Sequence, residues 1–327
     1  MAILISLRYG FALNTWKGLA VDLRQMRQFV AVAEELHFGR AANRLNMAQP
    51  PLSQAIRRLE LSLGVNLFNR SKRNVELSEA GAVFLIEARR TLMQADVARK
   101  MAQNAAAETP EVRISFIGPA LYQVLQEILV RFRTAAPNVH ARLFEIPTPQ
   151  QIEGILAGDY HVGFITHGIS HAGCESMLVE RSRFVAAVPG NSALASRKSI
   201  SLTELAEQPF ILPPHKYAEQ SETLNLFKNV GVVPRVEQEA SQTNTTLSLV
   251  SAGLGCSLVM ATAALQAIRN VCFLQIEDSI PHARWEMAMA WLPDHLNPET
   301  RRFLDSANRH LEENPKLLDA EAYRRWL

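Results

Sequence analysis

Cysteine is scarce in this sequence, and its placement excludes several kinds of site. Only three of the 327 residues are cysteine, namely Cys174, Cys256 and Cys272, and they form no C-x-x-C pair and have no histidine at zinc-ligand spacing. We therefore expect no disulfide framework, no metal site and no cofactor. Isolated, reduced thiols are typical of cytoplasmic proteins.

Long apolar runs are also lacking. No stretch approaches the roughly 18 apolar residues needed to cross a bilayer. The apolar opening from Met1 to Leu7 is followed by Arg8 and leads to no small-residue cleavage site, so a signal peptide is not expected either. The sequence predicts a cytoplasmic protein that does not engage a membrane.

No catalytic constellation is present. Cys174 or Cys256 could act as a nucleophile, but the sequence places no base beside either one, and no serine or carboxylate arrangement is evident. Scattered histidines are more often surface or packing residues than ligands, and the candidates here are His161, His167, His171 and His215. The sequence therefore predicts that the protein is not an enzyme.

The composition leaves the class of partner open. With 48% hydrophobic and 20% charged residues, the chain has ample material for packed cores, and its length predicts two or three domains. The net charge is only +2. Because this value is close to zero, the distribution of charge along the chain must decide whether the partner is a nucleic acid.

Residues 1–20 show no clear periodicity, and the first amphipathic pattern begins at Asp22. We interpret 1–20 as an N-terminal extension. Since Val21 directly precedes the pattern, translation starting there, on a codon usually read as valine, would place 1–20 outside the native protein. Detection of Met1 by mass spectrometry would contradict that start site.

The next stretch predicts a small helical domain followed by a long helix. Apolar residues recur at helical spacing from Asp22 to Leu63, which indicates three helices, with Asp22 as the first N-cap. A short hairpin with a charged tip follows Gly64. We expect this domain to span 21–78 and a helix capped by Ser78 to span 79–107. Its stripe of small and apolar residues suits pairing with a second copy: Phe84, Ala88, Thr91, Ala95, Ala98, Ala102 and Ala105.

Positive charge is concentrated in the small domain. Residues 40–73 carry seven basic side chains and one carboxylate, Glu60, for a net charge of +6. Such a patch gains from counterion release on a DNA duplex, although a basic cluster alone is often only a solvated face. Within it, Ala41, Ala42 and Leu45 precede a turn and a second helix, which is the pattern of a helix-turn-helix.

The second helix of this pattern is suited to reading DNA. Its first turn offers amides that can contact adenine edges, prolines that can press on thymine methyls, and a hydroxyl for phosphate. Apolar positions further along, Leu52, Ile56 and Leu59, are expected in the core. The candidate DNA contacts on this helix are Gln49, Pro50, Pro51, Ser53, Gln54 and Arg57.

A long run of this domain resembles the LysR-type transcriptional regulators. The run begins at Asp22, reads AANRLNMAQPPLSQAIRRLE from Ala41 to Glu60, and continues as LGVNLFNR to Arg70. The resemblance extends to about Leu311. It implies an α/β protein with an N-terminal winged helix-turn-helix, a long linker helix, and a C-terminal periplasmic-binding-protein-like domain of two α/β subdomains. It also implies that Arg73 on the wing reaches the minor groove and that Arg70 holds the DNA backbone.

After a hinge near residues 108–110, β-rich runs alternate with helical patterns, which predicts parallel or mixed sheets covered on both faces. We expect this C-terminal domain, which would sense the effector, to span 111–316, with a C-terminal tail at 317–327. Strands are predicted at 112–117, 141–146, 161–166, 184–188, 210–212, 235–239, 256–259 and 285–292.

Two helix starts in this domain predict an effector site. Thr148 is expected to be an N-cap, with Pro149 at the first helical position and Gln151 as its capping-box partner, and Gly118 follows another strand. Exposed amides at helix N-termini favour carboxylates, although simple caps explain these residues as well. The resemblance implies a cleft, and the candidate ligand contacts are Gly118, Pro119, Ala120, Thr148, Gln151, Phe164, Pro214 and His215.

The sequence thus predicts a DNA-binding transcription regulator modulated by a small molecule, which we expect to be an organic or aromatic acid. Expected partners are a partly palindromic stretch of double-stranded DNA, the effector, further copies in a homodimer or homotetramer, and RNA polymerase as a candidate. The alternative is a solute-binding protein or a sensor without a role in transcription. The basic helix-turn-helix favours the regulator.

Overall fold

A computed structural model describes residues 21–70, 74–105, 110–166, 173–214, 222–280 and 284–320. It divides between Gln103 and Asn104 into two compact units, each with a hydrophobic core of its own. The predicted extension at 1–20 lies outside the described residues. Among the helices that are described, none is long and apolar enough to span a membrane.

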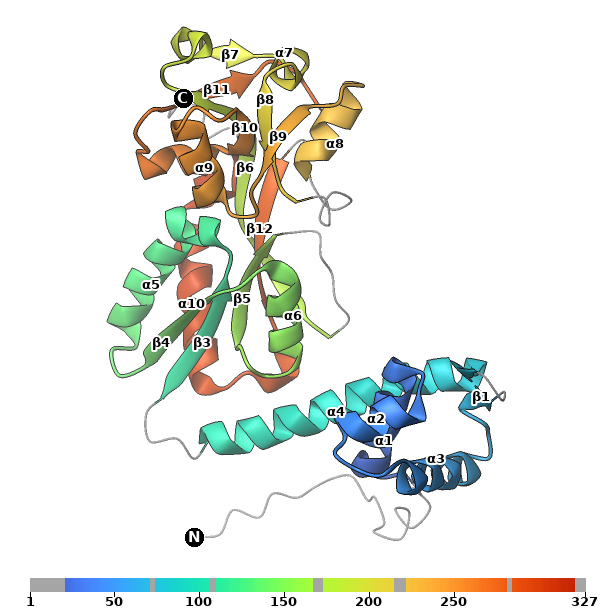
Figure 1. Cartoon of the computed structure of the whole chain (residues 1–327). Helices are drawn as coiled ribbons and strands as arrows, with labels where there is room; N and C mark the ends of the chain where they lie inside the picture. The colour runs from blue at the N-terminus through green and yellow to red at the C-terminus, as the bar shows by residue number, and fades with distance from the viewer. Residues whose placement is uncertain are drawn as a thin grey trace, which may run out of the picture. The chain divides into compact units, whose positions relative to one another are not determined.

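The N-terminal unit contains three short helices, a hairpin and a long helix (Figure 1). In chain order they are α1 (Leu23–Glu35), α2 (Phe38–Arg44), α3 (Gln49–Leu63), β1 (Phe68–Arg70), β2 (Val75–Leu77) and α4 (Glu79–Ala105). The two strands are antiparallel, with Phe68 opposite Leu77. The three helices, the hairpin and the long helix predicted from the sequence are all confirmed.

Local sequence explains where these helices begin and end. The Asp22 carboxylate accepts the N–H of Gln25 at 2.7 Å, and the Gln25 side chain accepts the N–H of Asp22 at 3.0 Å, which closes a capping box. Ser78 Oγ accepts the N–H of Gly81 at 2.9 Å at the start of α4. The N-caps predicted at Asp22 and Ser78 are therefore confirmed.

The core of this unit joins all of its elements. Leu52, Ile56 and Leu59 on α3 are fully buried, as predicted. The ring of Phe29 on α1 lies 5.3 Å from that of Phe68 in the hairpin and 4.9 Å from that of Phe84 on α4. The hairpin and the start of α4 are thus held against the helix-turn-helix by aromatic contacts.

Part of the stripe predicted for helix pairing packs inside the N-terminal unit instead. Phe84 and Ala88 pack into the core of their own unit, so they are not available to a second copy. The exposed apolar side chains on the first half of α4 are instead Val83 and Ile86, which are 62% and 55% accessible. The difference arises because the start of α4 must also cover the hairpin.

The C-terminal unit is built on one eight-stranded mixed sheet and one two-stranded sheet (Figure 1). Most strands of the large sheet follow the order β4-β3-β5-β12-β6-β11-β7, and β10 pairs with β6. The small sheet pairs β8 with β9 in parallel. The strands are β3 (Glu111–Phe116), β4 (His140–Glu145), β5 (Val162–Thr166), β6 (Glu175–Pro189), β7 (Ser199–Ile200), β8 (Pro209–Leu212), β9 (Arg235–Glu239), β10 (Ser257–Met260), β11 (Val271–Ile276) and β12 (Arg284–Trp291).

Every strand predicted from the sequence overlaps an observed one, but three features were missed. β7 and β11 were not predicted, and β6 begins at Glu175 rather than near Phe184. The first part of β6 carries Glu180, Arg181 and Arg183, and charged residues of this kind are uncommon in strands. They obscured the alternating pattern on which the prediction depended.

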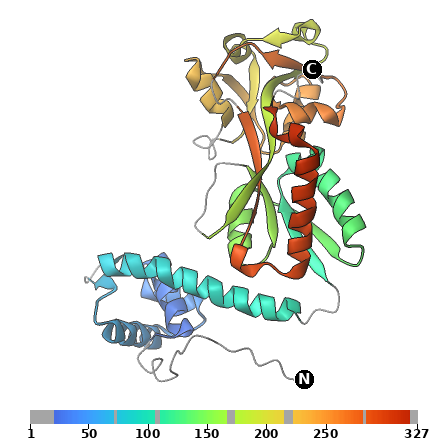
Figure 2. The ribbon, with the colours of Figure 1, turned by 180° about the vertical axis from the view of Figure 1, so that it is seen from behind.

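The large sheet has a first half, made of β4, β3, β5, β12 and the first part of β6, and a second half, made of the last part of β6 with β10, β11 and β7. Helices cover both faces of the first half. Alternate residues of a strand point to opposite faces. Accordingly, Phe164 of β5 packs in the core with α5 (Val124–Ala135) and α10 (Pro298–Glu313), whereas Ile165 packs in a separate cluster with α6 (Thr148–Leu156). Figure 2 shows α5 and α10 side by side, and the rings of Phe132 and Phe303 meet at 5.2 Å between them.

Strands β6 and β12 join the two halves of this unit. β6 pairs with β12 through its first part and with β10 and β11 through its last part, so one strand belongs to both halves. The second half also carries α7 (Leu202–Ala206), α8 (Glu222–Asn229) and α9 (Thr243–Ser251). At the C-terminus, Leu317 and Ala320 fall in the predicted tail but are 1% and 3% accessible.

Candidate functional site

The first turn of α3 presents the predicted DNA contacts on the surface. Gln49, Pro50, Pro51, Gln54 and Arg57 are exposed, and Ser53 is half-buried. Ala48 is the N-cap and offers no side-chain hydrogen bond to the helix. Since Pro50 and Pro51 have no N–H, few backbone donors of this turn need a partner in the protein. The turn is therefore open to an external ligand.

Ion pairs divide the basic residues of this unit into two groups. Arg40 and Arg44 on α2 contact Glu35, and Arg44 also contacts Glu34 at 2.7 Å. A hydrogen bond from Arg89 on α4 is the main reason that the pKa of Glu34 is lowered. Arg57 and Arg58 on α3 are exposed and form no ion pair with any described residue. Among the described side chains, α3 thus carries exposed and unpaired positive charge, as does α1 at Arg24 and Arg27.

The hairpin is fixed to the end of α3 by a buried carboxylate. Glu60 is 8% accessible, and its Oε1 accepts the N–H groups of Leu67 at 3.0 Å and Phe68 at 3.2 Å. This holds the start of β1 against α3. The backbone of Arg70 lies in β1, whereas its side chain and the whole of Arg73 fall outside what the structure describes.

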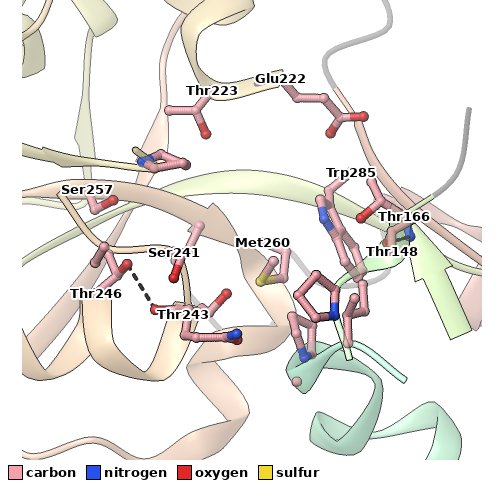
Figure 3. A pocket seen from close by; sticks show the side chains of 18 of the residues that line it. Thr148, Thr166, Glu222, Thr223, Ser241, Thr243, Thr246, Ser257, Met260 and Trp285 are labelled. Atoms are coloured by element: carbon pink, nitrogen blue, oxygen red, sulfur yellow. Dashed lines mark hydrogen bonds between the residues drawn. The ribbon is translucent and has the colours of Figure 1, made fainter. Parts of the chain in front are cut away.

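A pocket of about 370 Å³ opens in the C-terminal unit (Figure 3). This volume lies within the range of small-molecule sites. Its walls come from the ends of β4 and β5, from the starts of α6, α8 and α9, and from β6, β10 and β12. The side chains labelled in Figure 3 include Thr148, Thr166, Glu222, Thr223, Ser241, Thr243, Thr246, Ser257, Met260 and Trp285.

Three of the predicted ligand contacts line this pocket, namely Gly118, Pro119 and Thr148. Ala120 and Phe164 are fully buried in the core, and Pro214 is half-buried without lining the pocket. His215 lies outside the described residues. The sequence placed the cleft at the right strand ends but could not say which side chains there turn inward.

Gln151 is a structural residue rather than a pocket wall. It is fully buried, and its Nε2 donates to the carbonyls of Ile146 at 2.7 Å and Phe164 at 3.0 Å. Its Oε1 accepts from Ser115 Oγ at 3.0 Å. The prediction that Gln151 closes a capping box was wrong, because these buried partners outcompete the helix start.

The two helix starts differ in detail from the prediction. Pro147 is the N-cap of α6, so Thr148 is its first residue and not its cap. Thr148 Oγ1 instead accepts the N–H of Thr166 at 3.1 Å, which links α6 to the end of β5. Gly118 opens a short 3₁₀ helix, Gly118–Tyr122, rather than an α-helix.

The opposite wall of the pocket was missed by the sequence analysis. It is formed by α8, α9, β10 and β12. The run from Ser241 to Thr246 could have signalled it, because polar residues precede the apolar part of α9 there. No local sequence pattern marks Glu222 or Trp285 as a pocket residue. They reach the pocket because the fold brings α8 and β12 together from distant parts of the chain.

Glu222 is the charged side chain that burial perturbs most in this pocket. Burial raises its pKa to about 7, and the charge of Glu286 acts in the same direction. Its Oε2 is buried and has no hydrogen-bond partner in the structure as described.

Away from the pocket, burial lowers the pKa of His161 to about 4. His161 therefore packs as a neutral ring, and its Nδ1 accepts the N–H of Arg113.

No group of three histidine, cysteine or carboxylate side chains within the described ranges could hold a metal ion. Cys174 and Cys272 are half-buried, and Cys256 is buried with its pKa raised to about 11 by desolvation. A thiol with a raised pKa is a poor nucleophile at neutral pH. Within the part of the chain that the structure describes, the candidate sites are the surface of α3 and the pocket.

Comparisons with known proteins agree on both units. A model described as a bacterial regulatory helix-turn-helix protein of the lysR family matches residues 23–82, and a model of the LysR substrate binding domain matches residues 105–312. The HTH-type transcriptional regulator AlsR of Bacillus subtilis (strain 168) is 35% identical over 294 residues, which cover 88% of this chain and 96% of AlsR. TfdS of Cupriavidus pinatubonensis is 35% identical over 88% of this chain and 98% of its own length.

Solved structures of full-length regulators match over nearly the same span. CbnR, a LysR family transcriptional regulator solved in complex with its target DNA, is 29% identical, with a TM-score of 0.54 over 88% of this chain and 99% of that one. Full-length BenM is also 29% identical, with a TM-score of 0.54 over 90% of this chain and 98% of that one.

Proposed function

Because this chain belongs to the LysR family of transcriptional regulators, we propose that α3 reads promoter DNA and that the pocket receives the small molecule that modulates this binding. The family supplies the general activity, namely DNA-binding transcription regulation with an effector-binding domain. The residues that carry it in this chain are the proposal. The observation that supports it most directly is the exposed first turn of α3, backed by the unpaired Arg57 and Arg58.

On DNA, α3 would enter the major groove with its first turn toward the base edges. Gln49 and Gln54 would read bases, Pro50 and Pro51 would contact thymine methyls, and Ser53 would bind phosphate. Arg57, one helical turn beyond Ser53, would reach the backbone. Arg70 and Arg73 would act from the hairpin, with Glu60 holding that hairpin in place.

The active species would be a homodimer, or a tetramer of dimers, on a partly palindromic site. Two copies of α3 must lie about one helical turn of DNA apart, which a dimer achieves by symmetry. The exposed Val83 and Ile86 on α4 offer an apolar surface for this pairing. The promoter-bound protein would also be placed to contact RNA polymerase.

The effector would act by binding differently to two arrangements of the oligomer. Strands β6 and β12 connect the halves that form the pocket, so a ligand that touches both halves biases their relative orientation. Its effect would appear as altered bending or spacing of the bound DNA rather than as new chemistry.

The proposal is tested by capturing genomic DNA with the purified full-length protein and footprinting the recovered promoter. The change Arg57→Ala should weaken binding to all sequences. It should also make the plot of log K against log salt less steep, by about 0.9 in slope magnitude, since one phosphate contact is lost. The matched control is Arg302→Ala, which removes an exposed charge from α10 of the other unit. An Arg57→Ala protein with the wild-type footprint and salt slope would exclude α3 as the DNA-binding helix.

A further inference from the structure

The described walls of the pocket carry negative but no positive charge. Two carboxylates line it, Glu145 at the end of β4 and Glu222 at the start of α8. No lysine, arginine or histidine is found among the described residues that line it. An anion entering this pocket would meet like charge and no counter-charge from the described walls, and like charges in a partly desolvated site repel strongly.

Glu222 is the more enclosed of the two carboxylates. It is half-buried, its Oε2 is buried, and that atom lacks a hydrogen-bond partner in the described structure. Glu286, whose charge acts on Glu222, is itself paired with Arg181 at 2.6 Å. A buried carboxylate oxygen without a partner is costly unless a ligand supplies a donor.

Hydroxyl groups on α9 and β10 add hydrogen-bond acceptors. Ser257 Oγ donates its proton to the carbonyl of Ile211 at 2.9 Å, and Thr246 Oγ1 donates to the carbonyl of Gln242 at 3.2 Å. Since a hydroxyl has one proton and two lone pairs, both oxygens can only accept from a ligand. Glu222, Ser257 and Thr246 therefore each offer an acceptor to a ligand in this pocket.

Apolar side chains complete the pocket between these polar walls. Trp285 is 6% accessible and Met260 is 7% accessible, and both line the cavity with Phe184 and Pro119. Figure 3 shows Glu222 and Trp285 along the same side of the pocket. The face of an indole ring attracts a cation as well as an apolar group.

We propose that this pocket takes a small organic cation, a protonated amine whose N–H groups bind Glu222 and whose apolar part lies against Trp285 and Met260. The inference rests on the proposed function, because it takes this pocket to be the effector site. It differs from the organic acid expected from the sequence, an expectation that rested on the helix starts and on the family resemblance. An amine supplies the donors that Glu222, Ser257 and Thr246 lack.

Proton release gives the proposal a signature of its own. The pKa of Glu222 is raised to about 7 by burial, with the charge of Glu286 contributing, so about half of this carboxyl is protonated at pH 7. A bound ammonium group favours the charged form and lowers this pKa, and binding then releases about half a proton. A bound carboxylate would have the opposite effect and take up protons.

The test uses full-length protein without DNA and matched probes on two frames, benzyl and cyclohexylmethyl. Each frame is offered with an ammonium, a carboxylate or a hydroxyl group, and binding is measured by titration calorimetry at pH 7 in two buffers of different ionisation enthalpy. We expect an ammonium probe to bind at least tenfold more tightly than its carboxylate partner and to release protons. The change Glu222→Gln should abolish both the preference and the release.

The control is Glu153→Gln, which alters an exposed carboxylate on α6 that does not line the pocket, and it should preserve both. Tighter binding of the carboxylates, proton uptake, equal binding of ammonium and hydroxyl probes, or binding of none of the probes would overturn the proposal. Promoter footprinting of the ligand-free protein tests the proposed function independently, so a failure of one is distinguishable from a failure of the other.

Discussion

At the scale of single residues, Glu180 is a carboxyl group that folding removes from water. It lies on β6, is fully buried, and neither of its oxygens has a hydrogen-bond partner among the described residues. Burial raises its pKa to about 7, the nearby Thr262 hydroxyl lowers this pKa in part, and the charge of Glu127 raises it further. The folded protein therefore keeps a proton that the unfolded chain would release.

This raised pKa predicts that stability falls as the pH rises. Below pH 4.5, the reference pKa, both states are protonated, whereas between about 4.5 and 7 only the folded state is. The change Glu180→Gln removes this titration. The free energy of unfolding of the variant, relative to that of the wild type, should therefore be larger at pH 8 than at pH 5 by on the order of 1 to 3 kcal/mol. Urea unfolding followed by tryptophan fluorescence measures this, since Trp285 and Trp291 lie in that unit.

The exposed Glu153→Gln change is the control and should shift stability equally at both pH values. If Glu180→Gln and the wild-type protein show the same pH dependence, Glu180 is ionised in the folded state. The residue would then have a partner that neutralises it.

At the scale of elements, the junction of α3, the hairpin and α4 decides how the wing is presented. Glu60 holds the N–H groups of Leu67 and Phe68, and the N–H of Ser78 donates to the carbonyl of Leu67 at 3.0 Å. Gly81 at the start of α4 packs directly on that carbonyl, and a Cβ added there would overlap its oxygen. One peptide group therefore ties three elements together.

The packing at Gly81 predicts a severe effect of one methyl group. Gly81→Ala must displace either α4 or β1, at a cost of about 2 to 4 kcal/mol. Hydrogen exchange at the β1–β2 segment of the full-length protein should therefore accelerate, and affinity for promoter DNA should fall with it. The measurement is mass spectrometry of peptides covering residues 64–81.

The matched control for this glycine is Gly64→Ala. Gly64 has a φ of 70° and no atom within 4 Å of an added Cβ, so its replacement should cost only about 1 kcal/mol of backbone strain. Equal exchange rates in the two variants would show that the contact with Leu67 does not constrain the hairpin.

At the scale of the whole molecule, the proposed regulation couples the DNA-binding unit to the effector-binding unit through an oligomer. The surface proposed for pairing is the exposed apolar part of α4, where Ile86 is 55% accessible. Apolar side chains that stay exposed in a single chain favour association. α4 is suited to this role because its remaining apolar side chains, such as Phe84 and Ala88, are used within its own unit.

We accordingly expect Ile86→Glu to shift the protein from oligomer to smaller species in sedimentation velocity. The cause is the desolvation of a carboxylate in an apolar contact. The control is Leu61→Glu, which makes the same kind of change at an 80% accessible residue on α3 and should leave the oligomer intact. An unaltered sedimentation profile for Ile86→Glu would exclude this part of α4 from the interface.

The amino-acid sequence alone determined the architecture and the helix-turn-helix. The capping box at Asp22, the prolines of α3 and the buried positions at Leu52 and Ile56 all follow from spacing and local hydrogen bonding, which need no distant partner. For the same reason the linker helix and most strands were predicted close to their observed bounds. Local patterns are enough wherever an element's own residues satisfy its backbone and define its buried face.

Only the tertiary structure decided which side chains line the pocket. Gln151 was expected at the ligand but is buried by contacts with β3 and β5, whereas Glu222 and Trp285 come together from segments over 60 residues apart. The pairing of Arg40 and Arg44 with α1 likewise neutralises two of the basic residues that the sequence counted, whereas Arg57 and Arg58 on α3 stay unpaired among the described residues. Burial, charge pairing and unmet hydrogen bonds depend on neighbours that are distant in sequence, and folding alone brings those neighbours together.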